Sequence, residues 1–266
     1  MLRARPASFP RRDRADSVGG VTDATRTAPG DYSLDAALDE EAGSMDRLLD
    51  TVHGLTDADV RAPSRLPGWS RGHVLTHIAR NADGLRNLLT WAATGVETPM
   101  YPSQASRDAD IEAGAGRSAA DLEADVESSG ERLLAAFADF PPEGLERPVR
   151  TGSGAVIYGW EIPVVRIREI EIHHVDLDVG YTPAHWSPEF VVRTLDQLTD
   201  LFRNQRDVPV HTLRGTGTGR EWQVGTAGPT LTGPESALLA WLTGRSAGDG
   251  LTSDADGPIP AAPRWT

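Results

Sequence analysis

The sequence predicts a mainly α-helical protein in which a four-helix bundle precedes a small α+β unit. Four segments between residues 33 and 179 either carry apolar residues at three- and four-residue steps or form one long apolar run. Both patterns are typical of packed helices. After Gly180 the pattern changes to short apolar pieces separated by glycines, lying between two further helical segments. We therefore assign the bundle to residues 33–182 and the α+β unit to residues 187–250.

Serine residues mark the expected starts of the first three helices, which follow Ser33, Ser70 and Ser118. A serine side chain at this position accepts a hydrogen bond from a backbone N–H group that has no partner within the helix. Ser118 is followed by Asp121, a spacing that resembles a capping box. The second of these helices is expected to end by Gly95, because glycine commonly follows the last turn of a helix.

The fourth segment, residues 160–179 (WEIPVVRIREIEIHHVDLDV), can be interpreted in two ways. Its β-branched residues partly alternate with polar ones, which is typical of a strand. Its length of 20 residues and the three helices before it favour a buried helix that begins near Pro163. We predict the helix, and we expect Asp176 and Asp178 to cap or solvate its end.

The α+β unit is predicted to open with a helix after Ser187 and to close with the helix ESALLAWLTG. Residues 251–266 are rich in Gly and Pro and predict a tail. Residues 1–32 are rich in Arg, Asp, Ala, Gly and Pro without an apolar period. They predict a disordered or extended tail that takes no part in catalysis. Strands are expected around residues 208–213, 222–224 and 230–232.

Composition excludes several classes of chemistry. All 26 basic residues are Arg, so the chain has no lysine for a Schiff base, a pyridoxal anchor or a Walker-type phosphate loop. It has no Cys, so any reactive thiol must arrive on a small molecule. A formal charge of −13 argues against nucleic-acid binding. No segment has the roughly 18 apolar residues of a membrane span or the apolar core of a secretion signal. We therefore expect a cytoplasmic protein that does not bind membranes.

The segment 160–179 also carries two pairs of side chains that commonly bind metals. Glu169 and His173 lie four residues apart, whereas Glu171 and His174 lie three apart on nearly the opposite face. Helical bundles build metal sites from a Glu and a His on one helix with a third ligand from a facing helix. Because apolar residues surround the segment almost completely, periodicity does not choose between the pairs. For the first pair, a structural network with a neighbouring arginine is the alternative.

A third ligand is available in the GHVLTH run, where His73 and His77 share one helical face. The run is similar to the H-E-x-x-H sequence of zinc proteases, but Val74 stands where the catalytic Glu would be. His73 lies near the start of a helix, where an exposed structural role is the alternative. Three protein ligands would leave a zinc ion with an open fourth position, which is the arrangement of catalytic sites.

Four stretches of the sequence are distinctive as a set. They read LPGWSRGHVLTHIARNADGLRNLLTWAATGVETPMYPS, RDADIEAGAGR, IREIEIHHVDLDVG and, more weakly, GPESALLAWLTGRS. Over about residues 33–250 the chain resembles the mycothiol-dependent maleylpyruvate isomerases, which belong to the DinB-like metal-binding bundle superfamily. The resemblance implies a DinB-like four-helix bundle followed by the α+β unit.

The resemblance also implies a divalent zinc ion held by His77, Glu169 and His173. His77 is preferred to His73 because the ligand in the family is followed by an apolar residue and an RNAD run. This chain departs from the family at His174, where relatives often carry a small residue.

The activity that the resemblance implies is the cis–trans isomerisation of maleylpyruvate to fumarylpyruvate, in gentisate-type degradation of aromatic compounds. Zinc would hold the thiol of mycothiol as a thiolate, which adds reversibly to the double bond and allows rotation. The lack of Cys agrees with a thiol supplied by mycothiol. The expected partners are therefore mycothiol and a small dicarboxylate. The sequence leaves the oligomeric state open, with a monomer among the options.

A dianionic substrate needs cationic partners, which in this chain must be arginines. Arg245, at the end of ESALLAWLTGR, is the first candidate for a two-bond carboxylate clamp, and capping of its own helix is the alternative. Arg80, on the same predicted helix as His77, is the second candidate. Two other functions stay open: a mycothiol S-transferase or detoxifying enzyme on the same scaffold, and a non-enzymatic regulatory bundle protein.

Overall fold

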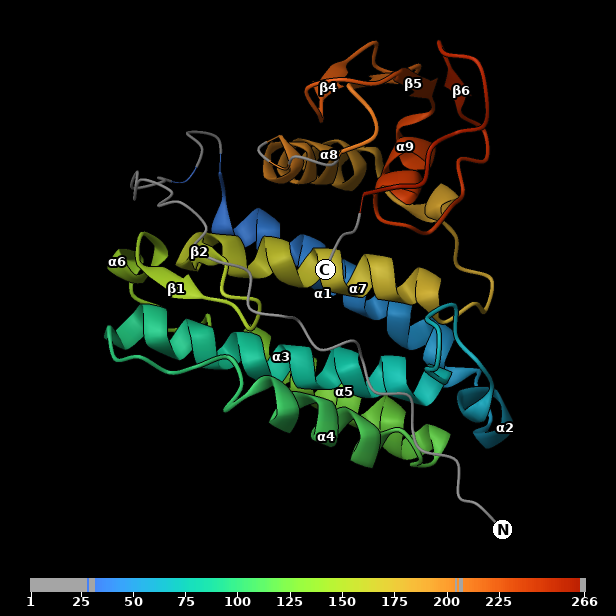
Figure 1. Cartoon of the computed structure of the whole chain (residues 1–266). Helices are drawn as coiled ribbons and strands as arrows, with labels where there is room; N and C mark the ends of the chain where they lie inside the picture. Colours follow the sequence, from blue (N-terminus) through green and yellow to red (C-terminus); the bar gives the residue numbers. More distant parts are fainter. Residues whose placement is uncertain (1–27, 29–31, 204, 206–207, 264–266) are drawn as a thin grey trace.

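The N-terminal part of the computed structural model consists of four long helices (Figure 1), α1 (Leu34–His53), α3 (Arg71–Thr94), α5 (Ala119–Ala135) and α7 (Ile162–Asp176). The structure describes residues 28, 32–203, 205 and 208–263. α1 and α3 each pack against both α5 and α7, so the four helices close around an apolar centre. This arrangement confirms the predicted four-helix bundle. None of the helices in the described part of the chain is long and apolar enough to cross a bilayer.

The serine caps expected from the sequence are present at the starts of α1, α3 and α5. The side chains of Ser33, Ser70 and Ser118 each accept a hydrogen bond from the backbone N–H three residues further on. At the other end of α3, Gly95 has a φ of 73°, a left-handed conformation that a residue with a Cβ rarely adopts. These local signals therefore set the ends of the bundle helices.

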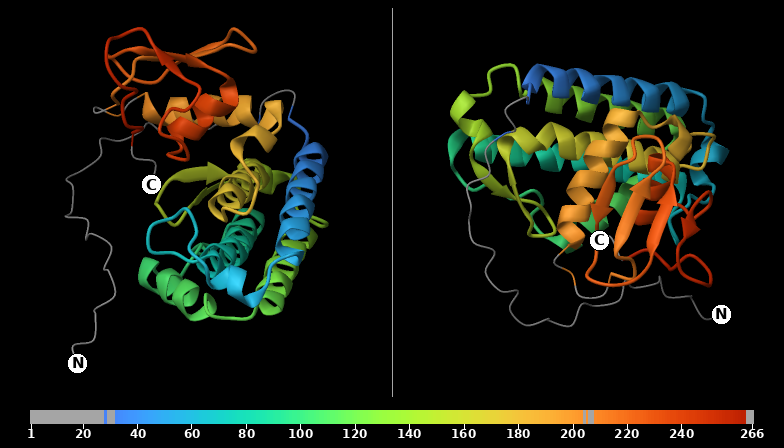
Figure 2. Two further views of the ribbon diagram at one scale, coloured as in Figure 1. Left: turned by 90° about the vertical axis from the view of Figure 1, so that its right-hand side faces the viewer. Right: turned by 90° about the horizontal axis from the view of Figure 1, so that it is seen from above.

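The segment 160–179 is helical, so the strand alternative is wrong. The 3-10 turn η1 (Gly159–Glu161) leads into α7, and Pro163 lies in the first turn of the helix. α7 lies between the other bundle helices and the C-terminal unit (Figure 2) and is therefore buried on several sides. Ile170 packs into the bundle, whereas Ile172 packs into the core of the C-terminal unit. Burial on opposite faces accounts for the apolar residues around most of this helix.

Short elements in the connections of the bundle were not predicted. α4 buries only Ile111, and its apolar period is too weak to indicate a helix from the sequence. α4 nevertheless packs on α3 and places residues beside the candidate site. The unpredicted elements are α2 (Asp57–Arg61), α4 (Gln104–Gly114), α6 (Pro142–Leu145) and the hairpin strands β1 (Pro148–Arg150) and β2 (Val156–Tyr158).

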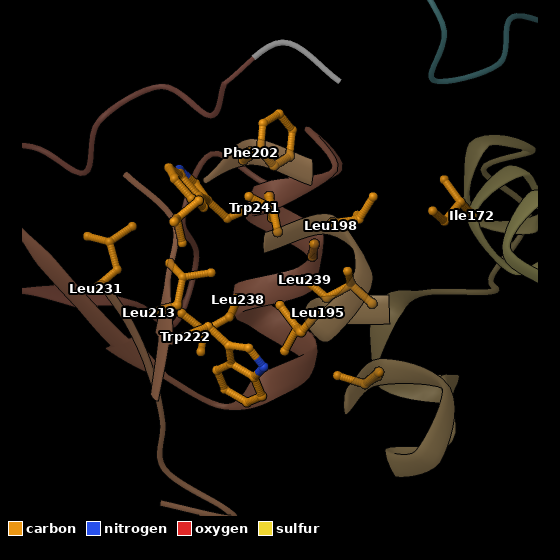
Figure 3. Close-up of a cluster of buried hydrophobic side chains, with 14 of the residues drawn as sticks. Ile172, Leu195, Leu198, Phe202, Leu213, Trp222, Leu231, Leu238, Leu239 and Trp241 are labelled. Atoms are coloured by element: carbon orange, nitrogen blue, oxygen red, sulfur yellow. The ribbon is translucent and has the colours of Figure 1, made fainter. Parts of the chain in front are cut away.

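The C-terminal unit packs helices against a four-stranded sheet. Its elements are η2 (Pro183–His185), α8 (Pro188–Phe202), β3 (Thr212–Gly215), β4 (Glu221–Gln223), β5 (Thr230–Gly233), α9 (Glu235–Leu242) and β6 (Thr252–Ser253). The strand order is β4-β3-β5-β6, with β3 and β5 parallel and the other pairs antiparallel. Leu195, Leu213, Leu238 and Trp241 belong to the core of this unit (Figure 3). The predicted α+β unit is confirmed.

The C-terminal boundary predicted at residue 250 is too early. Ser253 in β6 pairs with Leu231 in β5, so the sheet takes up residues that were expected to form a tail. Further along, the indole Nε1 of Trp241 donates a hydrogen bond of 2.8 Å to the carbonyl of Pro260. The Gly- and Pro-rich segment therefore packs on the unit, where its turns let the chain return to the sheet and to α9.

The N-terminal tail predicted over residues 1–32 lies almost wholly outside the described residues. Its last residue, Tyr32, is an exception. The Tyr32 ring meets the Trp160 ring edge to face at 5.4 Å, and its hydroxyl donates a hydrogen bond of 2.9 Å to the Trp160 carbonyl. The tail prediction is therefore corrected at this residue, which anchors the start of α1 to the turn before α7.

The two units contact each other along α1 and α7. Arg193 of α8 donates two hydrogen bonds of 2.7 Å to the carboxylate of Glu40 in α1. Trp186 donates one of 3.1 Å to the carbonyl of Glu171 in α7. The C-terminal unit is thereby held against the part of α7 that carries the predicted metal ligands.

Candidate metal centre

The three side chains predicted to bind a metal converge between α3 and α7. His77 comes from the second turn of α3, and Glu169 and His173 come from successive turns of α7. Nε2 of His77 is 3.2 Å from Oε2 of Glu169 and 3.1 Å from Nε2 of His173. Oε2 of Glu169 and Nε2 of His173 are 3.7 Å apart. One potential ligand atom from each residue therefore lies within 4.8 Å of the other two.

This donor set suits a divalent cation. Two imidazoles and one carboxylate are found in catalytic zinc sites, which keep a fourth position for water or substrate. Among the residues that the structure describes, this is the one cluster of three such side chains that could hold a metal. Glu169 and His173 keep 20% and 13% of their side-chain surface exposed, so the cluster is partly accessible to solvent. The residues fit zinc in both chemistry and spacing.

The electrostatics of the cluster favour the protonation states that metal binding requires. Burial, together with the neighbouring His173, lowers the pKa of His77 to about 4, so this ring is neutral at pH 7. Burial alone would raise the pKa of the Glu169 carboxyl, but the hydrogen bond to His77 and nearby cationic groups bring it well below its usual range. A neutral imidazole and an ionised carboxylate are the forms that coordinate a metal.

A buried carboxylate orients His173 from behind. Oδ2 of Asp176 lies 2.8 Å from Nδ1 of His173, and only 1% of the Asp176 side chain is exposed. Such a hydrogen bond keeps the ring proton on Nδ1 and leaves Nε2 free to bind a metal. Arg245 donates to both oxygens of Asp176, at 3.0 and 2.5 Å, and neutralises the buried charge. The expectation that Asp176 caps or solvates the helix end is therefore wrong, whereas Asp178 is exposed and pairs with Arg65.

The two arginines predicted to bind a substrate carboxylate both have protein partners. Besides its two bonds to a carboxylate, Arg245 donates from Nη1 to the Thr243 carbonyl at 2.6 Å, close to the end of α9. Arg80 lies on α3 but turns toward α5, where its Nη2 is 2.5 Å from Asp125 and 3.1 Å from Asp83. The structure thus brings Arg245 to the ligands indirectly and places Arg80 in an ion-pair network between α3 and α5.

The alternative ligand on α3 has a structural role. Nδ1 of His73 accepts a hydrogen bond of 3.2 Å from the backbone N–H of Ser70 and so completes the capping box of α3. Its Nε2 is 3.2 Å from the exposed carboxylate of Glu112. The structure therefore supports His77 over His73 as the residue that faces α7.

The alternative pair on α7 faces α1 instead of α3. Nε2 of His174 is 2.8 Å from the hydroxyl of Thr51, and its ring stacks on Tyr181 at 3.7 Å. Burial lowers the pKa of His174 to about 3. Glu171 accepts hydrogen bonds from Arg47, at 2.6 Å, and from the Tyr181 hydroxyl. This pair therefore belongs to a separate network, and among the described residues no third side chain completes a metal-binding group with it.

Three further residues border the cluster and were missed from the sequence. The Trp69 ring centroid is 5.7 Å from that of His77. Nη2 of Arg107 in α4 is 3.1 Å from Nδ1 of His77, and the Arg107 guanidinium lies 5.9 Å from the Tyr101 ring centroid. Burial and the neighbouring Glu169 raise the pKa of Tyr101 to about 12, so its hydroxyl is protonated at pH 7. These residues follow no spacing pattern, and the family-like stretches that contain them were the only signal available.

The fold and the site together define a helical-bundle protein with a candidate metal centre and a C-terminal α+β unit. Residues 42–178, just over half of the chain, match the family described as Mycothiol maleylpyruvate isomerase N-terminal domain, and the chain belongs to this family. Two solved structures are similar at 27% identity over 88% of this chain and 98% of their own. They are a mycothiol-dependent maleylpyruvate isomerase, with a TM-score of 0.83, and a histidine-to-alanine mutant of such an enzyme, with a TM-score of 0.82. No curated protein sequence matched.

Proposed function

We propose that the chain is a zinc- and mycothiol-dependent isomerase that converts maleylpyruvate to fumarylpyruvate. The observation that carries the proposal is the convergence of His77, Glu169 and His173 in a member of this family. The similarity of most of the chain to a solved mycothiol-dependent maleylpyruvate isomerase supports it. The reaction would serve the gentisate-type degradation of aromatic compounds.

The chemistry divides between the bound groups and the protein. With zinc and mycothiol bound, the site would supply a thiolate whose reversible addition to the cis double bond leaves a single bond that can rotate. The chain contributes no thiol of its own, because it has no Cys. His77 would hold the ion from α3, and Glu169 and His173 would hold it from α7. The carboxylate of Glu169 would offset part of the positive charge at the site.

The protein positions these ligands through contacts that do not involve the metal. Asp176 fixes the ring of His173, and Arg245 fixes Asp176 from the C-terminal unit. Such outer contacts keep ligands in the geometry that binding requires. The C-terminal unit therefore takes part in building the site, although none of the three ligands comes from it.

The test follows the absorbance of maleylpyruvate with purified protein, with and without mycothiol. We expect isomerisation only when both are present, with mycothiol regenerated and not consumed. Stoichiometric consumption of mycothiol would instead favour an S-transferase or detoxifying enzyme. Absence of both turnover and bound zinc would favour a non-enzymatic regulatory protein. His77→Ala is the negative control, because it lacks one proposed ligand and is assayed with the same mycothiol and substrate.

A further inference from the structure

The proposed reaction requires a cation that the residues assigned so far do not offer. Maleylpyruvate carries two carboxylates, and arginine is the only basic residue type in this chain apart from histidine. Arg245 directs two of its nitrogens at a buried carboxylate of the protein. Arg80 is engaged by two carboxylates between α3 and α5. A substrate carboxylate would have to displace a buried or doubly paired partner to reach either residue.

Arg107 of α4 lies directly against the ligand cluster. Its Nη2 is 3.1 Å from Nδ1 of His77, on the side of that ring away from Nε2. Its Nη1 is 2.9 Å from Asp108, the next residue in the chain, and the Asp108 side chain is 46% exposed whereas that of Arg107 is 19% exposed. An ion pair whose carboxylate is open to water is weakened, because water competes for the hydrogen bonds of that carboxylate. The guanidinium can therefore exchange Asp108 for a substrate carboxylate with a small loss of free energy.

The hydrogen bond between Arg107 and His77 is not compatible with a metal-loaded site. A histidine that binds a metal through Nε2 carries its proton on Nδ1. Nδ1 of His77 and Nη2 of Arg107 would then both be donors facing each other. Nη2 of Arg107 would consequently need another acceptor beside the cluster, and an anionic substrate is a suitable one.

We propose that Arg107 binds a carboxylate of the dianionic substrate and so selects dicarboxylates. This inference rests on the proposed isomerase function. The planar guanidinium of Arg107 can donate two parallel hydrogen bonds to a carboxylate. The Tyr101 ring, 5.9 Å from the guanidinium carbon, lies beneath it and helps to position it. Arg107 touches the substrate in this assignment, whereas Tyr101 is a positioning residue.

The test compares the wild type with Arg107→Gln and Arg107→Lys in the mycothiol-dependent assay. Arg107→Gln should raise KM for maleylpyruvate roughly 10- to 100-fold, because it removes a charge-assisted pair of hydrogen bonds. Arg107→Lys should have an intermediate KM, since it keeps the charge and loses the planar fork. In both variants, KM for mycothiol and the zinc content should stay at wild-type values. If Arg107 had a purely structural or metal-related role, at least one of these two quantities would change as well.

Arg117→Gln is the matched control. Arg117 lies between α4 and α5 and donates to Asp125 at 2.6 Å, and Asp125 keeps Arg80 as a partner when Arg117 is replaced. KM for maleylpyruvate should therefore not change in this variant. An unchanged KM in Arg107→Gln at full zinc content would overturn the assignment, as would an equal rise in KM for mycothiol.

An error in the proposed isomerase function can be distinguished from an error in the role of Arg107. In the former case the wild type itself would not isomerise maleylpyruvate. Calorimetric titration of zinc-loaded protein with maleylpyruvate, without mycothiol, then decides the role of Arg107. Weaker binding to Arg107→Gln than to the wild type supports carboxylate recognition by Arg107. The same affinity in both proteins overturns it.

Discussion

Replacement of Asp176 by Asn should weaken zinc binding although all three ligands remain. Asn keeps the shape of the side chain and can still accept a hydrogen bond. It removes the negative charge of the Asp176 carboxylate, which both His173 and Arg245 contact. Loss of such an outer partner lowers metal affinity or activity by about 10- to 100-fold in metal sites. This corresponds to roughly 1.4–2.7 kcal/mol of binding free energy.

The same substitution should lower the free energy of unfolding of the zinc-free protein. Arg245 would keep its charge in a mostly buried position without the opposite charge of Asp176, and breaking a buried pair costs about 3–5 kcal/mol. Burial opposes ionisation of Asp176, but hydrogen bonds to His173 and Arg245 prevail and lower its pKa. A carboxyl group whose pKa is lower in the folded state stabilises the fold at pH values above its unfolded pKa, which is near 3.8 for Asp. This stabilisation is lost as the pH falls through the lower pKa of the folded state. Asp176→Asn should lack this acid-induced loss.

The zinc affinity is measured by competition with a chromogenic chelator, and the unfolding free energy by urea denaturation. Asp178→Asn is the control. Asp178 lies two residues after Asp176, but its side chain is 54% exposed and pairs with Arg65 on the surface. Its effect on either quantity should stay within about 0.5 kcal/mol. Wild-type zinc affinity in Asp176→Asn would refute the role of Asp176 in orienting His173.

Zinc should be lost in His173→Ala and retained in His174→Ala, because only His173 faces His77; elemental analysis of the purified variants decides, and the reverse result would reassign the ligand. Glu41→Gln should remove a pH dependence of stability. Burial raises the pKa of Glu41 from 4.5 to about 7 against the opposing effect of Arg166, so the native state holds a proton that the unfolded state releases as the pH rises. The free energy of unfolding of the wild type should accordingly fall by about 3 kcal/mol between pH 4.5 and 7 because of this group. It is measured by urea denaturation at pH 5 and 8, and an equal fall in wild type and variant would count against this explanation. A chain beginning at Asp31 should keep its turnover and Tm, since it retains Tyr32 and all the ligands; a loss above a few-fold at unchanged zinc content would show that the removed residues act at the site.

The bundle helices could be predicted because their signals are local. A serine cap, an apolar period and a closing glycine together define α3 without reference to the rest of the chain. α4 and the β1–β2 hairpin could not be predicted, because they are short and bury few apolar side chains. α7 was ambiguous for the opposite reason. It is buried on several sides by two different units, and this removes the periodicity that distinguishes a helix from a strand.

The proposed metal ligands were only partly predictable from spacing. Both Glu169 with His173 and Glu171 with His174 lie on α7 at helical intervals, and the choice depends on which neighbour each face meets. The structure places His173 toward α3 and His174 toward α1. Asp176 lies three residues after His173 on α7, so helical spacing alone is compatible with their contact. The contacts of Arg245 with Asp176 and of Arg107 with His77 depend on the tertiary fold, so no local pattern could reveal them.

A zinc titration of the zinc-free protein, with maleylpyruvate turnover followed in the presence of mycothiol, tests most directly whether this cluster is the catalytic metal centre. Turnover should rise in proportion to added zinc and stop rising at one zinc per chain, because His77, Glu169 and His173 form a single site. His173→Ala should stay inactive through the same titration, whereas His174→Ala should follow the wild type. Full turnover before any zinc is added, or in His173→Ala, would contradict the claim that this cluster is the catalytic metal centre.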